Sequence, residues 1–219
     1  MRVTDLPSVR PTWAPDRPAG DGVPARRLEI AYGARPAHDL LRMEAARFHD
    51  VPARTIVLTH ECPRCGSDEH GQPRLLATAA VRNPAYVSLS RAGDLSVVAV
   101  TDAGPVGVDL EAEGAAGFAG FADVALHPDE RATAGTDPTR TWVRKEALLK
   151  AYGLGLAVDP GDIRLDHDGL ATWDSPHPAP GAVWLRDLDV PGHVVAVAVL
   201  PLDDQDVAAL SPTVRPART

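Results

Sequence analysis

The sequence contains one local pattern twice, a tight turn followed by a Val- and Ala-rich run, and each copy lies late in its half of the chain. The first copy is AGDLSVVAV (92–100) and the second is VPGHVVAVAV (190–199). A segment with the apolar spacing of an amphipathic helix precedes each copy, AHDLLRMEAARF (37–48) and TWVRKEALLKAYGLG (141–155). The repeated order predicts two similar α+β lobes, and we expect a ligand in the crevice between them.

Strand-like runs predict how neighbouring segments pair. Residues 95–101 and 106–111 are β-rich and are separated by a turn at 102–105 that contains Gly and Pro, which predicts a hairpin. In the second half, AVWLRDLDVPGHVVAVAVLP (182–201) predicts two strands around a Pro-Gly turn.

The two ends of the chain differ from the rest in composition. Residues 1–26 contain five prolines and little apolar periodicity, and the final SPTVRPART is similar, so we expect both to be flexible. These features divide the chain into a Pro-rich N-terminal segment (1–26), an N-terminal lobe (27–105), a C-terminal lobe (106–205) and a flexible tail (206–219).

Charge and hydropathy exclude some classes of function. A formal net charge of −8 offers no basic face for a long polyanion, so we expect no nucleic-acid binding, although a small phosphate ligand is compatible with it. The N-terminal residues lack the apolar stretch of a secretory signal, and no apolar run reaches the roughly 18 residues that span a bilayer. We therefore expect a cytoplasmic protein that does not bind membranes.

Both cysteines of the chain lie in one short stretch, THECPRCGSDEHG (59–71). Cys62 and Cys65 are flanked by His60 and His70, so these four side chains could form a zinc site. The alternative is a polar turn with reduced thiols, and the sequence leaves both open.

The two lysines of the chain, Lys145 and Lys150, lie in the second helical segment, whereas every other basic residue counted in the net charge is arginine. A helical wheel places Trp142 and Leu149 on the same side as both lysines and Glu146, so this side is not an ordinary solvated face. One interpretation is a surface pair, because Glu146 and Lys150 have the favoured i, i+4 order. The other is a functional lysine, since an ammonium group can meet phosphate as a compact charge and has a variable pKa.

A second set of charged residues lies in PVGVDLEAE (105–113). On a strand, Asp109, Glu111 and Glu113 project to one face, where the first carboxylates could share a Mg²⁺ ion. An edge strand decorated with acids is the alternative. Together with Glu146 and Lys150, the acids would supply a metal site, a base and a phosphate-binding cation, which are the parts of a phosphoryl-transfer site.

At these residues the chain resembles a known family. VGVDLE and WVRKEALLKAYGLGL are similar to the two signature motifs of the 4′-phosphopantetheinyl transferases. HGQP (70–73) and VSLSRAG (87–93) lie where the two-lobed (Sfp-type) members have a Gly-Lys-Pro and a Ser-His-Ser segment. The resemblance extends from about residue 38 to about residue 200.

The resemblance implies a pseudo-dimer of two similar α/β lobes with coenzyme A bound in the cleft. The implied reaction moves the 4′-phosphopantetheine arm to a serine of an acyl or peptidyl carrier protein, depends on Mg²⁺ and leaves adenosine 3′,5′-bisphosphate. The resemblance therefore implies a holo-carrier-protein synthase of polyketide, nonribosomal-peptide or fatty-acid biosynthesis, and we expect a monomer.

The resemblance also assigns roles to individual residues. Asp109, Glu111 and Glu146 would bind Mg²⁺, with Glu146 also acting as, or positioning, the base. Lys150 would stabilise the charge on the pyrophosphate. The nucleotide contacts would be Arg54, Gln72, Ser90 and Arg91, and Glu130 would be an acid near the metal.

Two positions depart from the family pattern. Arg91 replaces a histidine, and Gln72 replaces the lysine of Gly-Lys-Pro. The lost charge could be restored by Arg42, Arg47 or Arg74. These departures leave open a second reading, a non-catalytic homologue that binds coenzyme A or a carrier protein.

Overall fold

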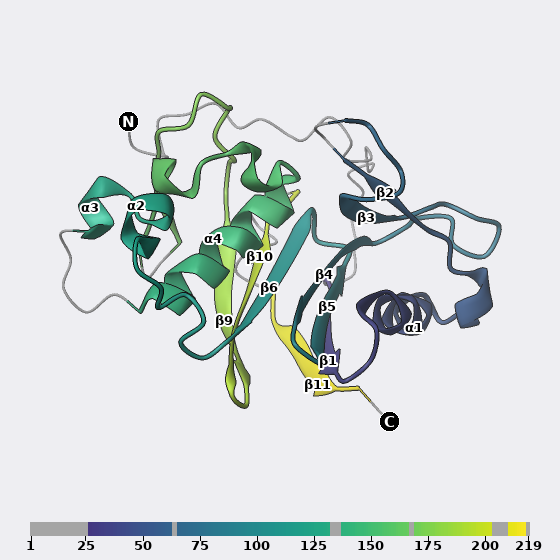
Figure 1. Ribbon diagram of the computed structural model, residues 1–219. Coiled ribbons are helices and arrows are strands. Elements are labelled where there is room, and N and C mark those ends of the chain that lie inside the picture. Colours follow the sequence, from purple (N-terminus) through teal and green to yellow (C-terminus); the bar gives the residue numbers. More distant parts are fainter. Residues whose placement is uncertain (1–25, 63–64, 132–136, 167–168, 203–209, 218–219) are drawn as a thin grey trace.

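The chain folds into a mixed α+β structure with several sheets and few helices (Figure 1). The computed structural model describes residues 26–62, 65–131, 137–166, 169–202 and 210–217. The strands are β1 (Leu28–Gly33), β2 (Leu58–Glu61), β3 (Gln72–Leu75), β4 (Tyr86–Ala92), β5 (Leu95–Thr101), β6 (Val106–Ala112), β7 (Ile163–Leu165), β8 (Leu170–Trp173), β9 (Trp184–Val190), β10 (His193–Val199) and β11 (Pro212–Pro216). The helices are α1 (Ala37–His49), α2 (Phe121–Ala125), α3 (Pro128–Arg131) and α4 (Pro138–Tyr152), with short 3₁₀ turns η2 (Ala53–Thr55), η3 (Gly155–Ala157) and η4 (Pro160–Asp162).

Two main sheets carry the fold. The first has the order β11-β1-β5-β4, and the second has the order β6-β10-β9. A first strand, a long helix, a two-stranded ribbon and a hairpin follow one another in each half, as β1, α1, β2-β3 and β4-β5 and then as β6, α4, β7-β8 and β9-β10. The sequence patterns that predicted the two long helices and the late Val/Ala strands therefore correspond to real elements.

Side chains of alternate strand positions pack in different cores. In β5, Val97 and Ala99 pack with residues of the second sheet, whereas Val98 and Val100 pack with α1. In the second sheet, the odd-numbered valines of β10 join the core between the sheets, and Ala196 joins the core under α4. Each sheet thus has one face toward its helix and one toward the other sheet, as the strand period of two requires.

The predicted hairpin of residues 95–101 and 106–111 is wrong. Strand β5 pairs with β1 on one edge and with β4 on the other, so neither edge is available to β6. Strand β6 pairs with β10 instead, and the turn at 102–105 carries the chain from the first sheet to the second. The hairpin predicted around the Pro-Gly turn is confirmed as β9-β10.

The end of the chain is partly ordered, although a flexible tail was expected from residue 206. Residues 212–216 form β11, which pairs in parallel with β1 at the edge of the first sheet. Arg215 donates to Glu29 over 2.8 Å and also pairs with Glu44. The prolines at both ends of β11 are compatible with an edge strand, since proline is tolerated there. The N-terminal segment that was expected to be flexible is 1–26, and all of it except residue 26 lies outside the described residues.

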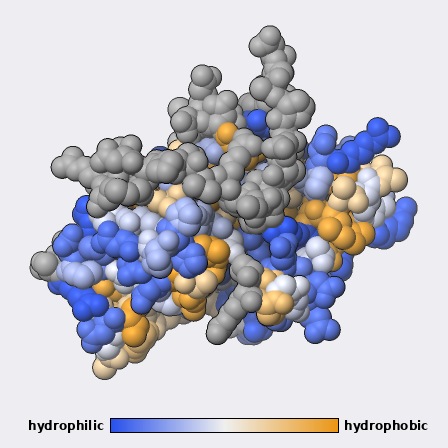
Figure 2. Space-filling model, turned by 90° about the horizontal axis from the view of Figure 1, so that it is seen from above, coloured by the Kyte–Doolittle hydropathy of each residue, from blue (hydrophilic) through white to orange (hydrophobic). Residues whose placement is uncertain are grey.

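The helices of the described ranges include no membrane-spanning segment. None of the helices in the described ranges combines the length and the apolar character that crossing a bilayer requires. On the face seen in Figure 2, hydrophilic side chains cover much of the described surface, and apolar side chains form separate patches.

Candidate active site between the two sheets

Strand β6 presents acidic side chains toward α4. Val108 and Leu110 are buried in the core between the sheets, so Gly107, Asp109 and Glu111 lie on the opposite face, as their alternation predicts. Asp109 is 4% exposed, whereas Glu111, nearer the end of the strand, is partly exposed. The strand therefore holds one buried and one accessible carboxylate at the helix.

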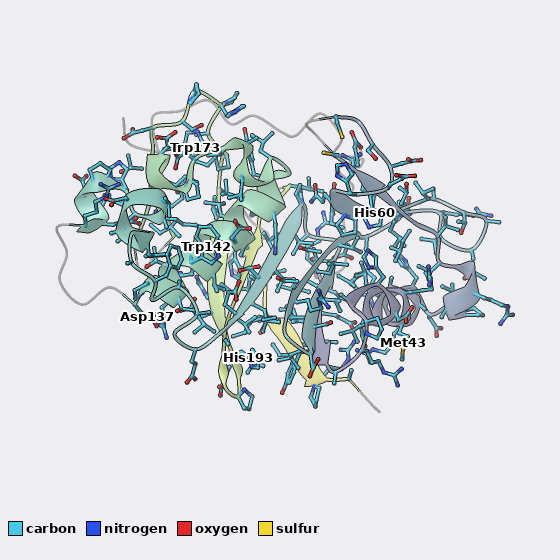
Figure 3. The ribbon with its side chains drawn as sticks, in the orientation of Figure 1. Met43, His60, Asp137, Trp142, Trp173 and His193 are labelled. Carbon is cyan, nitrogen blue, oxygen red and sulfur yellow. The ribbon has the colours of Figure 1, made fainter. Side chains whose placement is uncertain are left out.

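Helix α4 is fixed at both ends. Its N-cap Asp137, labelled in Figure 3, accepts hydrogen bonds from the backbone N–H groups of Thr139 and Arg140. It ends at Gly153, whose φ of 80° is the left-handed conformation common at helix C-termini. The helix packs on β6 and β10, and these caps set its limits along the sheet.

Gly107 allows α4 to lie directly on β6. A Cβ atom at this position would lie 2.0 Å from the carbonyl oxygen of Ala147 and 2.4 Å from the backbone nitrogen of Ala151. Only glycine fits there, so the backbone of the helix passes immediately over the strand. This approach brings Lys150 to Asp109.

Lys150 and Asp109 form the centre of the site. The Lys150 ammonium donates to Asp109 Oδ1 over 2.6 Å and to the Ser90 hydroxyl over 3.1 Å. Ser90, on β4, in turn donates to Asp109 Oδ1 over 2.7 Å. The three groups come from α4, β6 and β4, so the site joins the two sheets.

Two buried carboxylate oxygens lack partners at this centre. Among the described residues, neither Asp109 Oδ2 nor Glu146 Oε1 has a hydrogen-bond partner. Burial raises the pKa of Glu146, and the neighbouring Asp109 and Glu111 raise it further, while Lys150 opposes the rise. Burial and the charge of Asp109 also raise the pKa of Glu111, again against Lys150. A divalent cation with a preference for oxygen ligands suits this donor set, because it would satisfy the orphaned oxygens and reduce the repulsion.

The three carboxylates are not gathered as tightly as a closed metal site. In the described part of the chain, only the group Cys62, Cys65 and His70 has its ligand atoms within 4.8 Å of one another. The Lys150 ammonium lies 2.6 Å from Asp109 Oδ1 and neutralises part of the negative charge of this group.

A cleft of about 940 Å³ opens beside these residues and is lined by both halves of the chain. Its lining residues are Cys62, Gly71, Gln72, Pro73, Ser88, Leu89, Ser90, Glu146, Lys150, Gly153, Leu154, Gly155, Leu156, Ala157 and His177. This volume lies near the upper end of the range of small-molecule sites, which suits a large ligand such as a nucleotide conjugate.

Comparison with known protein families agrees with this geometry. Residues 105–197 match the family model of the 4′-phosphopantetheinyl transferase superfamily. The matched segment contains Asp109, Glu111, Glu146 and Lys150 and begins at the turn that leads into β6. A search of curated proteins finds no match. The match supports a phosphopantetheinyl transferase function in general.

Four of the eight predicted site residues line the cleft, whereas Asp109, Glu111, Arg54 and Arg91 are not part of its lining. Gln72, Ser90, Glu146 and Lys150 all lie in its wall, and the amide of Gln72 donates to the carbonyl oxygen of Lys150 over 3.0 Å. Arg54 and Arg91 are exposed and are not part of the cleft lining. Arg91 follows the inward-facing Ser90 on β4, so it points to the other side of the strand.

The arginines that were expected to replace the missing lysine charge are engaged elsewhere. Arg42 pairs with Asp39, Arg47 pairs with Glu29 and Glu44, and Arg74 pairs with Glu61 over 2.5 Å. Among the described residues that line the cleft, Lys150 is the only lysine or arginine.

Glu130 and Lys145 form a separate buried pair. The Lys145 ammonium is fully buried and donates to Glu130 over 2.5 Å and to the carbonyl oxygens of Ala125 and Pro160 over 2.7 and 2.9 Å. Glu130 also accepts from the backbone N–H groups of His127 and Leu165. Glu130, expected near the metal, is thus committed to Lys145 and to the backbone at His127 and Leu165, while Lys145 joins α4 to α2 and η4.

Sequence reasoning missed several residues of the site. Ser88 accepts a hydrogen bond from the backbone N–H of Val108 over 3.0 Å, which joins the edges of β4 and β6. Its position two residues before Ser90 on a strand was the available signal. Nothing local in the sequence indicated that His177 would line the cleft.

Proposed function

We propose that the protein transfers the 4′-phosphopantetheine arm of coenzyme A to a serine of an acyl or peptidyl carrier protein. The observation that carries this proposal is the cleft between the sheets, in which one ammonium faces a buried carboxylate and a second buried carboxylate has an orphaned oxygen. Coenzyme A contains a pyrophosphate that such an ammonium group could bind. The cleft is large enough for its nucleotide and its pantetheine arm.

The reaction is a displacement at phosphorus. The serine oxygen forms a bond to the phosphorus that carries the pantetheine arm, the bond from that phosphorus to the bridging oxygen breaks, and adenosine 3′,5′-bisphosphate leaves. Glu146 takes the proton of the serine, because its raised pKa brings a carboxylate base nearer to neutral pH. Lys150 exchanges its contact with Asp109 for the pyrophosphate oxygens and stabilises the charge of the leaving group.

The acidic residues fit a bound Mg²⁺ ion, and Asp109, Glu111 and Glu146 would hold it. When bound, it would neutralise negative charge on the pyrophosphate. We propose no nucleotide contact for Arg54 or Arg91, because neither lines the cleft.

The same proposal accounts for the doubled order of elements. The β1-β5-β4 and β6-β10-β9 sheets with their helices would be the two lobes of a pseudo-dimer, as in the two-lobed members of the superfamily. Because one chain then supplies both walls of the cleft, a monomer is sufficient.

The test is transfer to apo carrier proteins from several pathways, in the presence of coenzyme A and Mg²⁺, followed by intact-mass spectrometry. We expect the carrier to gain the mass of one phosphopantetheine arm, and we expect a chelator of divalent cations to prevent the gain. Folded protein that modifies none of the carriers would contradict the proposal.

A second candidate is a homologue that binds coenzyme A without transfer. It is favoured by Gln72, whose amide is used to bind the backbone of α4, and by the single cationic residue of the described cleft lining. Calorimetry that shows coenzyme A binding, together with no transfer in the assay above, would select this alternative.

A further inference from the structure

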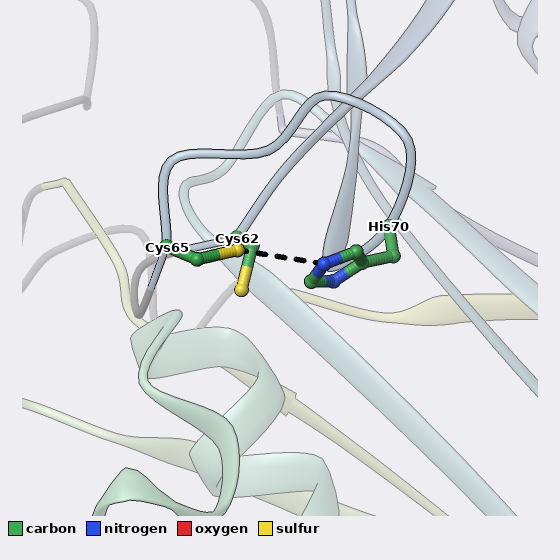
Figure 4. A group of neighbouring side chains, drawn as sticks. All are labelled: Cys62, Cys65 and His70. Carbon is green, nitrogen blue, oxygen red and sulfur yellow. Dashed lines mark hydrogen bonds between the residues drawn. The ribbon is translucent and has the colours of Figure 1, made fainter.

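The loop between β2 and β3 brings three soft ligands together. The side chains of Cys62, Cys65 and His70 converge so that their ligand atoms all lie within 4.8 Å of one another (Figure 4). The Cys65 sulfur lies 3.4 Å from His70 Nε2. Two of the ligands have the C-x₂-C spacing that is common in zinc sites.

The backbone of this loop is shaped for the cluster. The pairing of Glu61 with Gln72 closes the loop at its base. Just above it, Gly71 has φ 103°, and a Cβ atom there would lie 2.4 Å from the carbonyl oxygen of Glu61 and 2.7 Å from the Cα of Cys62. Glycine therefore allows the returning strand to pass against Cys62, which places His70 beside the thiols.

A second turn positions the other cysteine. The backbone N–H of Gly66 donates to the carbonyl oxygen of Cys62 over 2.8 Å, and the N–H of Cys62 donates to Ser67 over 3.0 Å. Gly66 has φ 70°, which a glycine adopts without strain. These bonds fold Cys65 back toward Cys62.

Apolar packing does not explain this arrangement. Residues 66–71 are Gly-Ser-Asp-Glu-His-Gly, and nearly all of them are exposed. A segment of this composition buries too little apolar surface to offset the entropy of ordering it. A metal ion that joins three of its side chains would supply the missing constraint.

We propose that Cys62, Cys65 and His70 bind one zinc ion, with the fourth position left to water or another small ligand. Two thiolates and an imidazole are ligands that zinc prefers, whereas Mg²⁺ prefers oxygen ligands. His60, which the sequence offered as a fourth ligand, lies on β2 with its Nε2 2.9 Å from Nε2 of His38 and is not a member of the cluster. The assignment does not depend on the proposed transferase activity.

The position of the cluster gives the ion a role beside the cleft. Cys62, Gly71 and Gln72 line the cleft, and Gln72 is bound to the last turn of α4 through the Lys150 carbonyl. Zinc would hold this part of the cleft wall against the helix that carries Glu146 and Lys150. Its removal should increase hydrogen exchange at residues 65–72 without unfolding the sheets.

The test measures metal on the full chain, purified under reducing conditions without a histidine tag. We expect one zinc per chain by elemental analysis, and Co²⁺ in its place should give thiolate charge-transfer absorption with the d–d bands of a tetrahedral site. Cys62→Ser, Cys65→Ser and His70→Ala should each lose stoichiometric zinc. Circular dichroism would check that each variant is folded.

Two histidine variants serve as matched controls. His193→Ala, in the β9-β10 hairpin (Figure 3), and His60→Ala should both retain zinc. Wild-type protein that binds neither zinc nor Co²⁺ through thiolates, or that carries a Cys62–Cys65 disulfide instead, would overturn the proposal. Retention of zinc by either cysteine variant, or its loss from His60→Ala, would overturn the ligand set.

Discussion

Lys145 and Lys150 share one helix but have different environments. Lys145 is fully buried and donates three hydrogen bonds to protein oxygens, so its role is to hold surrounding segments on the helix. Lys150 is 28% exposed, and it lines the cleft with its ammonium against Asp109. Only Lys150 can therefore meet a ligand, and the two lysines of the motif divide into one structural and one functional residue.

Glu146→Gln should abolish transfer while the fold is retained. The change is nearly isosteric but removes the carboxylate that would accept the serine proton, so we expect a loss of about 10²–10⁴-fold in kcat. Intact-mass assays of the carrier would measure it, with circular dichroism as the control. Activity near that of the wild type would exclude the proposed role of Glu146.

The pH dependence provides a second test of Glu146. Because burial raises its pKa, the acid limb of the kcat/KM profile should lie above the range of an ordinary glutamate, with activity falling as the pH falls through that pKa. Because its folded-state pKa is raised, Glu146 stabilises the fold only while its carboxyl group is protonated. This contribution to the free energy of unfolding is complete below the unfolded-state pKa of Glu146 and is lost as the pH rises through its folded-state pKa. At neutral pH, Glu146→Gln should therefore melt at the same temperature as the wild type or higher. A clear decrease in melting temperature would contradict this.

Lys150→Arg tests whether the position needs more than positive charge. The ammonium fits between Asp109 and Ser90, with Nζ 2.6 Å from the carboxylate, and a planar guanidinium on a longer stem does not fit the same point. We expect at least about a tenfold loss of kcat with little change in melting temperature. Full activity in steady-state assays would show that charge alone is sufficient.

At the scale of elements, the Lys145–Glu130 pair joins α4 to the segments around it. Lys145→Met should destabilise the protein by about 3–5 kcal/mol, because Glu130 would be left buried without its cation. Arg140→Met on the same helix is the matched control, since Arg140 is 58% exposed and its pair with Asp187 is worth about 0–1 kcal/mol. Chemical denaturation would measure the free energy of unfolding of both variants. An equal decrease in the two would contradict a structural role for Lys145.

The contact between β6 and α4 depends on Gly107. Gly107→Ala would place a methyl group against the helix backbone, so we expect the free energy of unfolding to fall by about 1–3 kcal/mol. Transfer should also decrease, because α4 must move away from Asp109. Gly117→Ala is the control, since that exposed position meets only the Gly114 carbonyl oxygen at 3.2 Å. Unaltered stability and activity of the Gly107 variant would show that the close approach is not needed.

Local patterns in the sequence predicted most helices and strands and the residues at the centre of the site. They could not predict which strands pair with one another, because the partners lie far apart in the sequence. The apolar period of α4 and the alternation of β6 are local, and they correctly predicted the packing face of the helix and the position of Asp109 opposite Val108 and Leu110. The side of α4 that holds both lysines is more buried than the period predicted, since Lys145 and Leu149 are fully buried. The partner of β6 depends on which edges of β5 are occupied by β1 and β4, which no local pattern encodes. Likewise, β11 pairs with β1, and its Arg215 meets Glu29 and Glu44, which are all far away in the sequence.

At the scale of the whole molecule, one core belongs to both sheets. Ile30 and Val97 of the first sheet pack in the same cluster as Val108 and Val197 of the second. If either sheet unfolded alone, the inner face of the other would become exposed to water. The cost of this exposure couples the two halves, because burial of apolar surface is the main favourable term in folding.

We therefore expect both halves to unfold in one transition. Of the described tryptophans, Trp184 packs in the shared core, whereas Trp142 and Trp173 pack only with residues of the second half. Fluorescence in a Trp13→Phe, Trp184→Phe background therefore reports on the second half. Far-UV circular dichroism reports on both halves. In urea, the two signals should give the same midpoint and slope, because separate unfolding would leave the shared core exposed. A dichroism transition without a fluorescence counterpart would show instead that the first sheet unfolds by itself and that the cleft can lose one wall while the other remains folded.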